Sequence, residues 1–428
     1  MSIISSFYIG VSGLSANSVE LSVVGDNIAN GNTIGFKGSR AAFSDVLGQS
    51  LIGGPGQLGG GTRVQSIQKL LAQGAIAQTG VATDLALDGD GMFVVEGRDG
   101  ERRYTRAGQF TLDQDGYLVN LGGLRVQGFN ADPLGNVGGA VGDLQIAGVT
   151  SPPVATTTVT MRGNLSADPT LTVLPPFDPN DPGATSNFST SVQVYDSLGN
   201  PHEVDMHFRL AGPGVWEWHA TMDGGTLDGG VAGTPIEVGT GTMSFDASGN
   251  LVDLTGDTLT FDPLGAPGAQ TVTLNLGDPL SLGGTGASGM VQQSTLASST
   301  SFVGQDGYGA GEIAGVQIDD EGNIVGTFTN GQTRALGQVA VANFAAPDQL
   351  DRIGGNLFAA TGDSGEPNLG VAGTGGRGHI VAGALEQSNV DLAGEFVRMI
   401  IAQRSFQANS KTMQTADQLL AELIQIKR

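Results

Sequence analysis

Few residues in this chain have the types and spacing that chemistry requires. The chain contains four histidines and no cysteine, which excludes disulfides, thiolate metal sites and a cysteine nucleophile. Glu203, Asp205 and His207 alternate along a predicted strand, so they share one face, where they could in principle hold a metal ion. An exposed strand face carries polar residues at the same period, and we expect that ordinary role here, with no metal.

Other catalytic and nucleotide-binding patterns lack the context they need. Residues 54–59 and 284–289 both match GxGxxG, but neither follows a clear strand and opens a helix, as a dinucleotide site requires. With 70 glycines, chance matches are expected. The sequence has no P-loop, HExxH or GxSxG motif, and no two of its acidic residues stand out as a catalytic pair. It therefore predicts a protein that is not an enzyme and binds no cofactor.

The composition narrows the possible partners. The 428 residues suggest about three domains, with 39% hydrophobic and only 14% charged residues. Asp and Glu outnumber Lys and Arg by 42 to 19, a net charge of −23, so neither nucleic acid nor an anionic membrane is an expected partner. No apolar run is long enough to span a membrane, and the first basic residue is Lys37, so we expect no Sec-type signal peptide.

Both ends of the chain carry large apolar residues at a period of seven, the spacing of amphipathic helices that pack on other helices. The N-terminal row is Phe7, Leu14, Leu21 and Ile28, and the C-terminal row is Leu392, Met399, Phe406, Met413 and Leu420. A helix over about 385–427 would be roughly 60 Å long, too long to bury its apolar face on a compact domain of ordinary size. Gly10, Gly13 and Gly25 weaken the N-terminal helix in isolation.

Two interpretations of these terminal rows stay open. The first is a hairpin of two core helices within one chain. The second is a pair of terminal helices that also pack against copies of themselves and become helical only on assembly.

The middle of the chain changes to the alternating pattern of short strands, with candidates at 156–160, 191–195, 271–276 and 337–342. A turn-like unit with an early Asp and a late Gly recurs at 112–117, 195–200, 245–250 and 318–323. Asp bonds its own backbone and Gly supplies left-handed φ, so we expect β-hairpins at these places. The four copies lack the ligand spacing of a calcium loop.

The predicted fold is multidomain, with terminal α-helices that form a coiled-coil-like module plus nested all-β domains. Its expected parts are a terminal helical domain (1–32 with 385–428), a linker or extension (33–75), a first β domain (76–150 with 291–384) and an outer acidic β domain (151–290). Proline- and glycine-rich runs suggest these boundaries. The insert 151–290 has two basic and fifteen acidic residues, a net charge of −13, so we expect it to face solvent.

Two motifs resemble those of bacterial flagellar rod and hook proteins. Asp26-Asn-Ile-Ala-Asn30, followed by Gly31-Asn-Thr-Ile-Gly35-Phe36-Lys37, is similar to the N-terminal signature of that family. Glu395-Phe-Val-Arg-Met-Ile-Ile-Ala-Gln403-Arg404, continuing through Asn409 and Lys411, is similar to its closing helix. We take as motif residues Asn27, Asn30, Gly35, Phe36, Gln403 and Lys411. Asn27 and Asn30 can end a helix on local backbone, and Gly31 and Gly35 permit positive φ.

The resemblance continues through residues 85–95 and 190–202, the second being similar to an outer domain found in hook proteins. It implies a structural subunit that self-assembles into the flagellar hook, the curved tube that joins rod to filament and transmits torque. The terminal rows would then be the assembly seam. Glycine-rich segments near 53–61, 151 and 289 are candidate hinges, although turns in a static domain use glycine equally.

The resemblance also implies partners and a location. The partners would be further copies of the chain, the distal rod protein, the hook cap protein and the hook–filament junction protein. The location would be extracellular, in the hook and basal body, after flagellar type III export without a cleaved signal. One alternative is a distal rod protein, against which the large insert argues. Another is a secreted β-rich adhesin, which would not explain the paired terminal rows.

Overall fold

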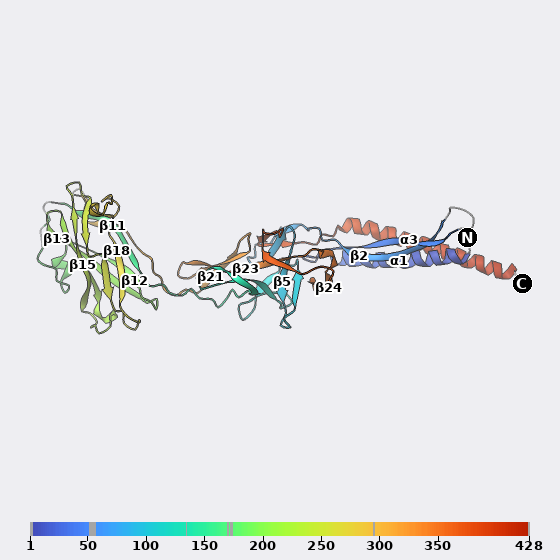
Figure 1. Cartoon of the computed structure of the whole chain (residues 1–428), viewed down its shortest axis with the longest axis horizontal. Coiled ribbons are helices and arrows are strands. Elements are labelled where there is room, and N and C mark those ends of the chain that lie inside the picture. The colour runs from blue at the N-terminus through green and yellow to red at the C-terminus, as the bar shows by residue number, and fades with distance from the viewer. Residues whose placement is uncertain are drawn as a thin grey trace. The chain divides into compact units, whose positions relative to one another are not determined.

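The computed structural model describes residues 3–50, 57–133, 135–168, 171, 174–293 and 296–426, and Figure 1 shows its elements. The chain divides into two compact units. Unit 1 comprises Met1–Val149, Ala314–Thr327 and Thr333–Arg428, and unit 2 comprises Thr150–Ile313 and Phe328–Gln332. Unit 1 combines long helices with strands, whereas unit 2 is almost entirely β. The predicted fold class, terminal helices plus nested all-β domains, is confirmed.

Two long helices of unit 1, α1 (Ile3–Ala29) and α3 (Leu392–Ile426), pack side by side (Figure 1). They run antiparallel, because Gly10 near the start of α1 lies against Met413, whereas Gly31, just past its end, lies against Leu392. The side-chain amide of Asn30 donates to the backbone oxygen of Asp26 at 2.9 Å, a local bond of the kind expected at a helix end.

Two details of the helix exit differ from the prediction. Asn27 does not bond local backbone: its side chain donates to the oxygen of Ser39 at 2.7 Å and accepts from the nitrogen of Ser39 at 2.9 Å. Gly35 has the expected positive φ, +68°, but Gly31 does not. A Cβ at Gly31 would lie 2.6 Å from Cδ2 of Leu392, so glycine is needed there because α3 passes close by.

Residues 33–75, expected to be a linker or extension, contain a long antiparallel hairpin of β1 (Ser39–Ser50) and β2 (Gln57–Lys69). The hairpin packs on α1. The backbone nitrogen of Thr62 donates to Oγ of Ser12 at 3.2 Å, and Gly61, at φ +103°, leaves room for that hydroxyl. α1 is therefore supported by the hairpin as well as by α3.

The β part of unit 1 joins strands from both sides of the insert. β4 pairs with β27, β3 with β28, and β23 with both β5 and β9, so the N-side and C-side segments share their sheets. Its strands are β3 (Ile76–Gln78), β4 (Leu85–Asp88), β5 (Met92–Glu96), β6 (Arg102–Thr105), β7 (Phe110–Leu112), β8 (Leu118–Asn120), β9 (Arg125–Ala131), β10 (Val137–Asp143), β21 (Ile313–Ile318), β22 (Asn323–Phe328), β23 (Thr333–Asn343), β24 (Asp351–Gly354), β25 (Leu357–Ala359), β26 (Asn368–Val371), β27 (His379–Ala382) and β28 (Ala384–Glu386).

Unit 2 has two five-stranded sheets, one in the order β12-β13-β14-β15-β16 and one built around β11, β17, β18, β19 and β20. Side chains of both sheets form one core, in which Trp216, Trp218 and Phe208 are fully buried. The strands are β11 (Thr158–Ser166), β12 (Phe188–Tyr195), β13 (Pro201–Gly212), β14 (Val215–Asp223), β15 (Pro235–Phe245), β16 (Leu251–Thr255), β17 (Thr258–Phe261), β18 (Gln270–Asn275), β19 (Met290–Gln293) and β20 (Ser299–Gln305). A short helix, α2 (Pro182–Thr185), precedes β12.

The four predicted Asp–Gly turns are confirmed. They connect β7 to β8, β12 to β13, β15 to β16 and β21 to β22. In each turn the Asp carboxylate accepts a backbone N–H from the residue four positions on, at 2.8 Å. The late glycines have φ near +80°: Gly116, Gly199, Gly249 and Gly322. The hydrogen bond of the Asp side chain and the positive φ of the glycine therefore favour the same hairpin turn in each case.

A buried ionic cluster ties the helix exit to the β part of unit 1. Lys37, two residues past the Gly35 turn, places Nζ 2.6 Å from Oε1 of Glu386 in β28. Arg106, after β6, places a guanidinium nitrogen 3.3 Å from Oε2 of the same carboxylate. Glu386 also accepts the backbone N–H of Gly74 at 2.8 Å. Burial lowers the pKa of Lys37, while contact with Glu386 opposes that shift.

Substituting Glu386→Ala would leave two cations facing one another without their anion. Removing one partner of a buried ion pair typically destabilises a fold by about 3–5 kcal/mol. We expect a loss of this size in the unfolding free energy of unit 1, measured by chemical denaturation. Glu101→Ala, which breaks an exposed contact to Arg103, is the control and should cost below ~1 kcal/mol. Equal losses in the two variants would contradict the role given to the cluster.

Candidate assembly interface

The seam between α1 and α3 is built on small residues. A Cβ at Gly10 would lie 3.0 Å from Cγ of Met413, and a Cβ at Gly13 would lie 2.6 Å from Nδ2 of Asn409. Ala16 on α1 is almost completely buried. Where these glycines lie against α3, the two helices approach more closely than larger side chains would permit.

Burial on α3 follows a row that the sequence reasoning missed. Glu395, Ala402 and Ala416 are buried, and Asn409 continues the same period of seven. These four residues lie three positions after the first four members of the predicted apolar row. A seven-residue hydrophobic pattern is recognised mainly by its large apolar residues. A row made of alanine, asparagine and glutamate was therefore not predicted to be buried. Their seven-residue spacing is nevertheless visible in the printed sequence.

The predicted apolar rows lie beside this small-residue row. Met413 and Leu392 contact α1 at Gly10 and Gly31, as described above. Phe7, Leu14, Leu21 and Ile28 of α1 are partly buried, and so are Met399, Met413 and Leu420 of α3. Leu392 and Phe406 remain 37% and 38% exposed. Within one chain, therefore, the predicted rows are only partly covered.

A second apolar surface on α3 remains open in the single chain. Phe396, Val397, Ile400 and Ile401 are each at least half exposed, and their spacing places them on adjacent positions of two successive turns. We call these four residues the outer patch. Such a contiguous apolar surface is characteristic of a contact site.

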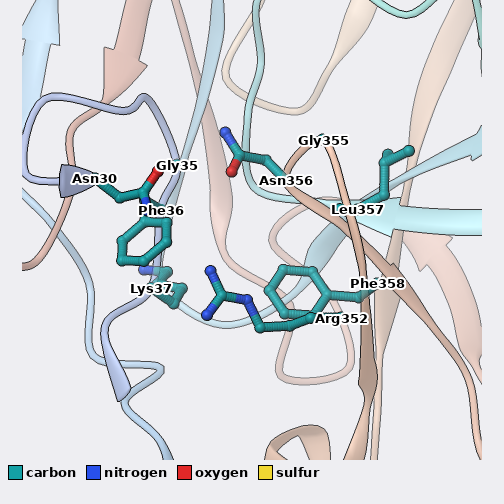
Figure 2. A pocket seen from close by; sticks show the side chains of 10 residues that line it. Asn30, Gly35, Phe36, Lys37, Arg352, Gly355, Asn356, Leu357 and Phe358 are labelled. Atoms are coloured by element: carbon teal, nitrogen blue, oxygen red, sulfur yellow. The ribbon is translucent and has the colours of Figure 1, made fainter. Parts of the chain in front are cut away.

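The N-terminal motif residues meet a turn of the β domain at a small cavity of about 210 Å³ (Figure 2). The Arg352 guanidinium lies 4.6 Å from the ring centroid of Phe36. Asn356, in the left-handed region at φ +60°, donates its side-chain amide to the oxygen of Ile34 at 2.9 Å. Asn30 and Gly35 also line the cavity. The motif thus fixes the path of the chain from α1 into the β domain.

The two C-terminal motif residues, Gln403 and Lys411, are exposed on α3. Neither side chain contributes to the α1 seam described above. In the part of the chain that the structure describes, Lys411 has no ion pair, and the same holds for the exposed Arg404.

The histidine cluster of unit 2 has an ordinary structural environment. Glu203 and Asp205 are exposed, whereas His207 is buried, with Nδ1 2.8 Å from Oγ of Ser189 and Nε2 3.1 Å from Oγ1 of Thr221. Phe177 covers the ring at a centroid distance of 5.3 Å. Burial lowers the pKa of His207. Among the residues that the structure describes, no group of three or more metal-binding side chains converges.

The remaining sequence patterns are located as follows. Residues 284–289 form a loop between the short 3-10 helix Leu280–Leu282 and β19, without the strand-to-helix turn of a dinucleotide site. Residues 54–59, and with them the candidate hinge at 53–61, lie partly outside the described residues. None of the helices in the described ranges has the length and hydrophobicity needed to cross a membrane.

Four family models match successive parts of the chain. They are described as flagella basal body rod protein (residues 7–37), flagellar hook protein FlgE/F/G D1 domain (86–167), flagellar basal body protein FlaE D2 domain (161–308) and flagellar basal body rod FlgEFG protein C-terminal (381–426). Together with the paired terminal helices, these matches define the class of axial proteins of the bacterial flagellum.

Full-length relatives narrow the class. The flagellar hook protein FlgE of Escherichia coli (strain K12) is 36% identical over 421 residues, covering 97% of this chain and 98% of the relative. That of Borreliella burgdorferi is 36% identical over 458 residues, with 99% of each chain covered. The crystal structure of Helicobacter pylori flagellar hook protein FlgE2 aligns over 73% of this chain and 100% of its own, at 17% identity and a TM-score of 0.48. The chain belongs to the flagellar hook protein family, and it is a structural subunit of the hook rather than a rod protein or an adhesin.

Gly13→Leu should separate α1 from α3, because the new side chain would occupy the space of Asn409. Gly25→Leu is the matched control, since a Cβ at Gly25 has no neighbour within 4 Å. We expect the critical concentration for polymerisation to rise at least about tenfold for Gly13→Leu, which corresponds to ~1.4 kcal/mol, and to stay nearly constant for Gly25→Leu. Sedimentation of polymer at graded protein concentrations measures both values, and equal behaviour of the variants would rule out the seam.

Proposed function

We propose that the α1–α3 pair forms the inner layer of the hook tube and that copies of the chain pack together through the outer patch of α3. The observation that carries this proposal is the exposure of Phe396, Val397, Ile400 and Ile401 beside an already paired α1. Burying one large apolar side chain stabilises a contact by ~1.5–3 kcal/mol. Four such residues per subunit can offset much of the entropy lost on ordering the chain ends.

The predicted apolar rows fit the same proposal. Leu392 and Phe406 remain more than one-third exposed after α1 has docked, so a neighbouring copy can complete their burial. The two interpretations left open by the sequence then become compatible. One chain supplies the antiparallel helix pair, and contacts between pairs supply the tube.

The β domains would carry the outer contacts of the tube. We assign residues 1–32 with 385–428 to the helical layer and 33–75 to the extension. The β part of unit 1 is the first β domain, and unit 2, which extends the expected range 151–290 through β20, is the outer acidic domain. The net charge of −13 in residues 151–290 favours solvent exposure. Torque would pass through the helical layer, and the segment near 151, where the chain passes from unit 1 to unit 2, would give the compliance that bending needs.

The remaining assignments follow from family membership. We propose that the chain is exported through the flagellar type III system without a cleaved signal. We also propose that it contacts the distal rod protein, the hook cap protein and the hook–filament junction protein in addition to its own copies. Its role would be mechanical, without catalysis.

Ile401→Asp tests the outer patch. Ile401 is 59% exposed in the single chain, so its replacement should leave both units folded while placing a charge in the contact between copies. We expect the variant to keep the wild-type unfolding transition and to raise the critical concentration for polymerisation by at least about a hundredfold, ~2.7 kcal/mol. Leu121→Asp replaces a leucine that is 74% exposed outside the helices and serves as the control. Polymerisation of Ile401→Asp at the wild-type concentration would refute the proposed contact.

A further inference from the structure

A further apolar surface of unit 1 lies on the hairpin of β1 and β2. Phe43 on β1 is 43% exposed, and Ile67 on β2 is 53% exposed. The register places Ala41 opposite Ile67 and Phe43 opposite Val64, and directly opposed residues of an antiparallel pair share a face. We call these four residues the hairpin face. The hairpin packs on α1, yet this face stays partly open in the single chain.

One negative charge lies on the same face. Asp45 follows Phe43 by two residues on β1, so the two side chains point to the same side of the hairpin. Asp45 is exposed, and it is the only acidic residue between positions 31 and 75. In the described part of the chain it has no ion pair. The carboxylate is therefore free to pair with a cation from another molecule.

The outer patch of α3 has a positive charge in the corresponding place. Arg404 follows Ile400 by four residues and Ile401 by three, so it lies one turn further along the same side of the helix. Arg404 is exposed and forms no ion pair among the described residues, whereas Arg398 contacts Glu395 at 2.9 Å. Arg404 is thus the unpaired cation next to the outer patch.

β1 and α3 run in the same direction along α1. Asn27, near the end of α1, bonds Ser39 at the start of β1, whereas Ser12, nearer the start of α1, bonds the backbone of Thr62, which pairs with Asp45. β1 is therefore antiparallel to α1, as α3 is. On both surfaces the apolar residues come first and the charge follows in that shared direction.

The distance from apolar residue to charge also agrees between the two surfaces. Asp45 lies two strand residues beyond Phe43, about 7 Å along β1. Arg404 lies four helix residues beyond Ile400, about 6 Å along α3. A hairpin face laid along an outer patch in the shared direction would bring Asp45 to Arg404 when Phe43 meets Ile400.

We propose that the hairpin face of one copy packs on the outer patch of a second copy, with Asp45 paired to Arg404 across the contact. This inference rests on the proposed function, because it names the surface that covers the outer patch. The occupant is a second copy rather than the same chain, since both surfaces remain exposed while the hairpin and α3 pack on one α1.

The two surfaces of this contact differ, so the contact is heterologous. Each copy presents its hairpin face to one neighbour and its outer patch to another. Repetition of such a contact builds a ring or an open helical array, which is the geometry that a tube requires.

Charge reversal tests the pair in the full-length chain. Asp45→Arg or Arg404→Asp alone places like charges across the contact, and we expect each to raise the critical concentration for polymerisation at least about fivefold. The double variant restores opposite charges and should polymerise within about twofold of the wild-type concentration. Arg98→Asp and Asp115→Arg reverse exposed charges in turns of the β part of unit 1 and should leave that concentration nearly unchanged. Single reversals without effect, or a double variant in which the losses add, would overturn the pair.

Cross-linking identifies the chains that meet. The wild-type chain has no cysteine, so Asp45→Cys and Arg404→Cys each carry a single thiol. Tubes assembled from an equal mixture of the two variants are treated with a short bismaleimide and run on a denaturing gel. We expect dimers from the mixture and far fewer from tubes of either variant alone. Equal yields from all three samples, or no dimers in well-formed mixed tubes, would rule out this contact.

The outcomes separate this inference from the proposed function. If Ile401→Asp blocks polymerisation while the single charge reversals do not, the outer patch stands and the hairpin face is not its partner. If Ile401→Asp polymerises as the wild type does, the proposed function fails. Dimers between the Asp45→Cys and Arg404→Cys chains then decide alone whether the hairpin and α3 of different copies meet.

Discussion

The close approach of α1 to α3 is the contact on which the rest of the helical module depends. Gly10, Gly13 and Gly31 lie where α3 leaves no room for a larger side chain. Glycine in a helix interior costs up to about 1 kcal/mol relative to alanine, so α1 is a poor helix in isolation. The seam provides the compensating packing. α1 therefore depends on its packing against α3.

The same constraint explains the structure around the seam. The hairpin of β1 and β2 covers part of α1, and Asn27 bonds the backbone at Ser39 where the hairpin begins. Lys37, Glu386 and Arg106 then fix the chain to the β sheets a few residues beyond the helix. α3 starts six residues after Glu386, so both helices are anchored at the same ionic cluster. Force applied to the helix pair can reach the β part of unit 1 through buried contacts rather than through a loose linker.

Much of this architecture could be predicted from the sequence, for identifiable reasons. The two terminal helices, the strand-rich middle and the four Asp–Gly turns all depend on local patterns of residue type. The apolar rows of the helices could be predicted because leucine, methionine and phenylalanine are large apolar residues, so their seven-residue spacing is easily recognised in the sequence. The turn at Gly35 could also be predicted from the local sequence, because its backbone has a positive φ, which favours glycine.

What the sequence did not predict depends on distant neighbours. Asn409 is a seam residue because Gly13 of α1 lies opposite it, and Ala402 and Ala416 are buried on the same row of α3. The Lys37–Glu386 pair joins residues 349 positions apart, so no local sequence pattern predicts it. The role of Asn27 was misassigned for the same reason: its partner, Ser39, lies beyond the helix exit.

Cross-linking of Gly10→Cys to Met413→Cys in the assembled hook tests the central claim most directly. The chain has no other cysteine, and a Cβ at position 10 would lie 3.0 Å from Cγ of Met413, so oxidation should join the two positions without large movement. If α1 and α3 of the same chain form the seam, the disulfide will close within single chains, which keep monomer mass on a non-reducing gel. Disulfides that link different chains, or none at all in well-formed tubes, would contradict the account.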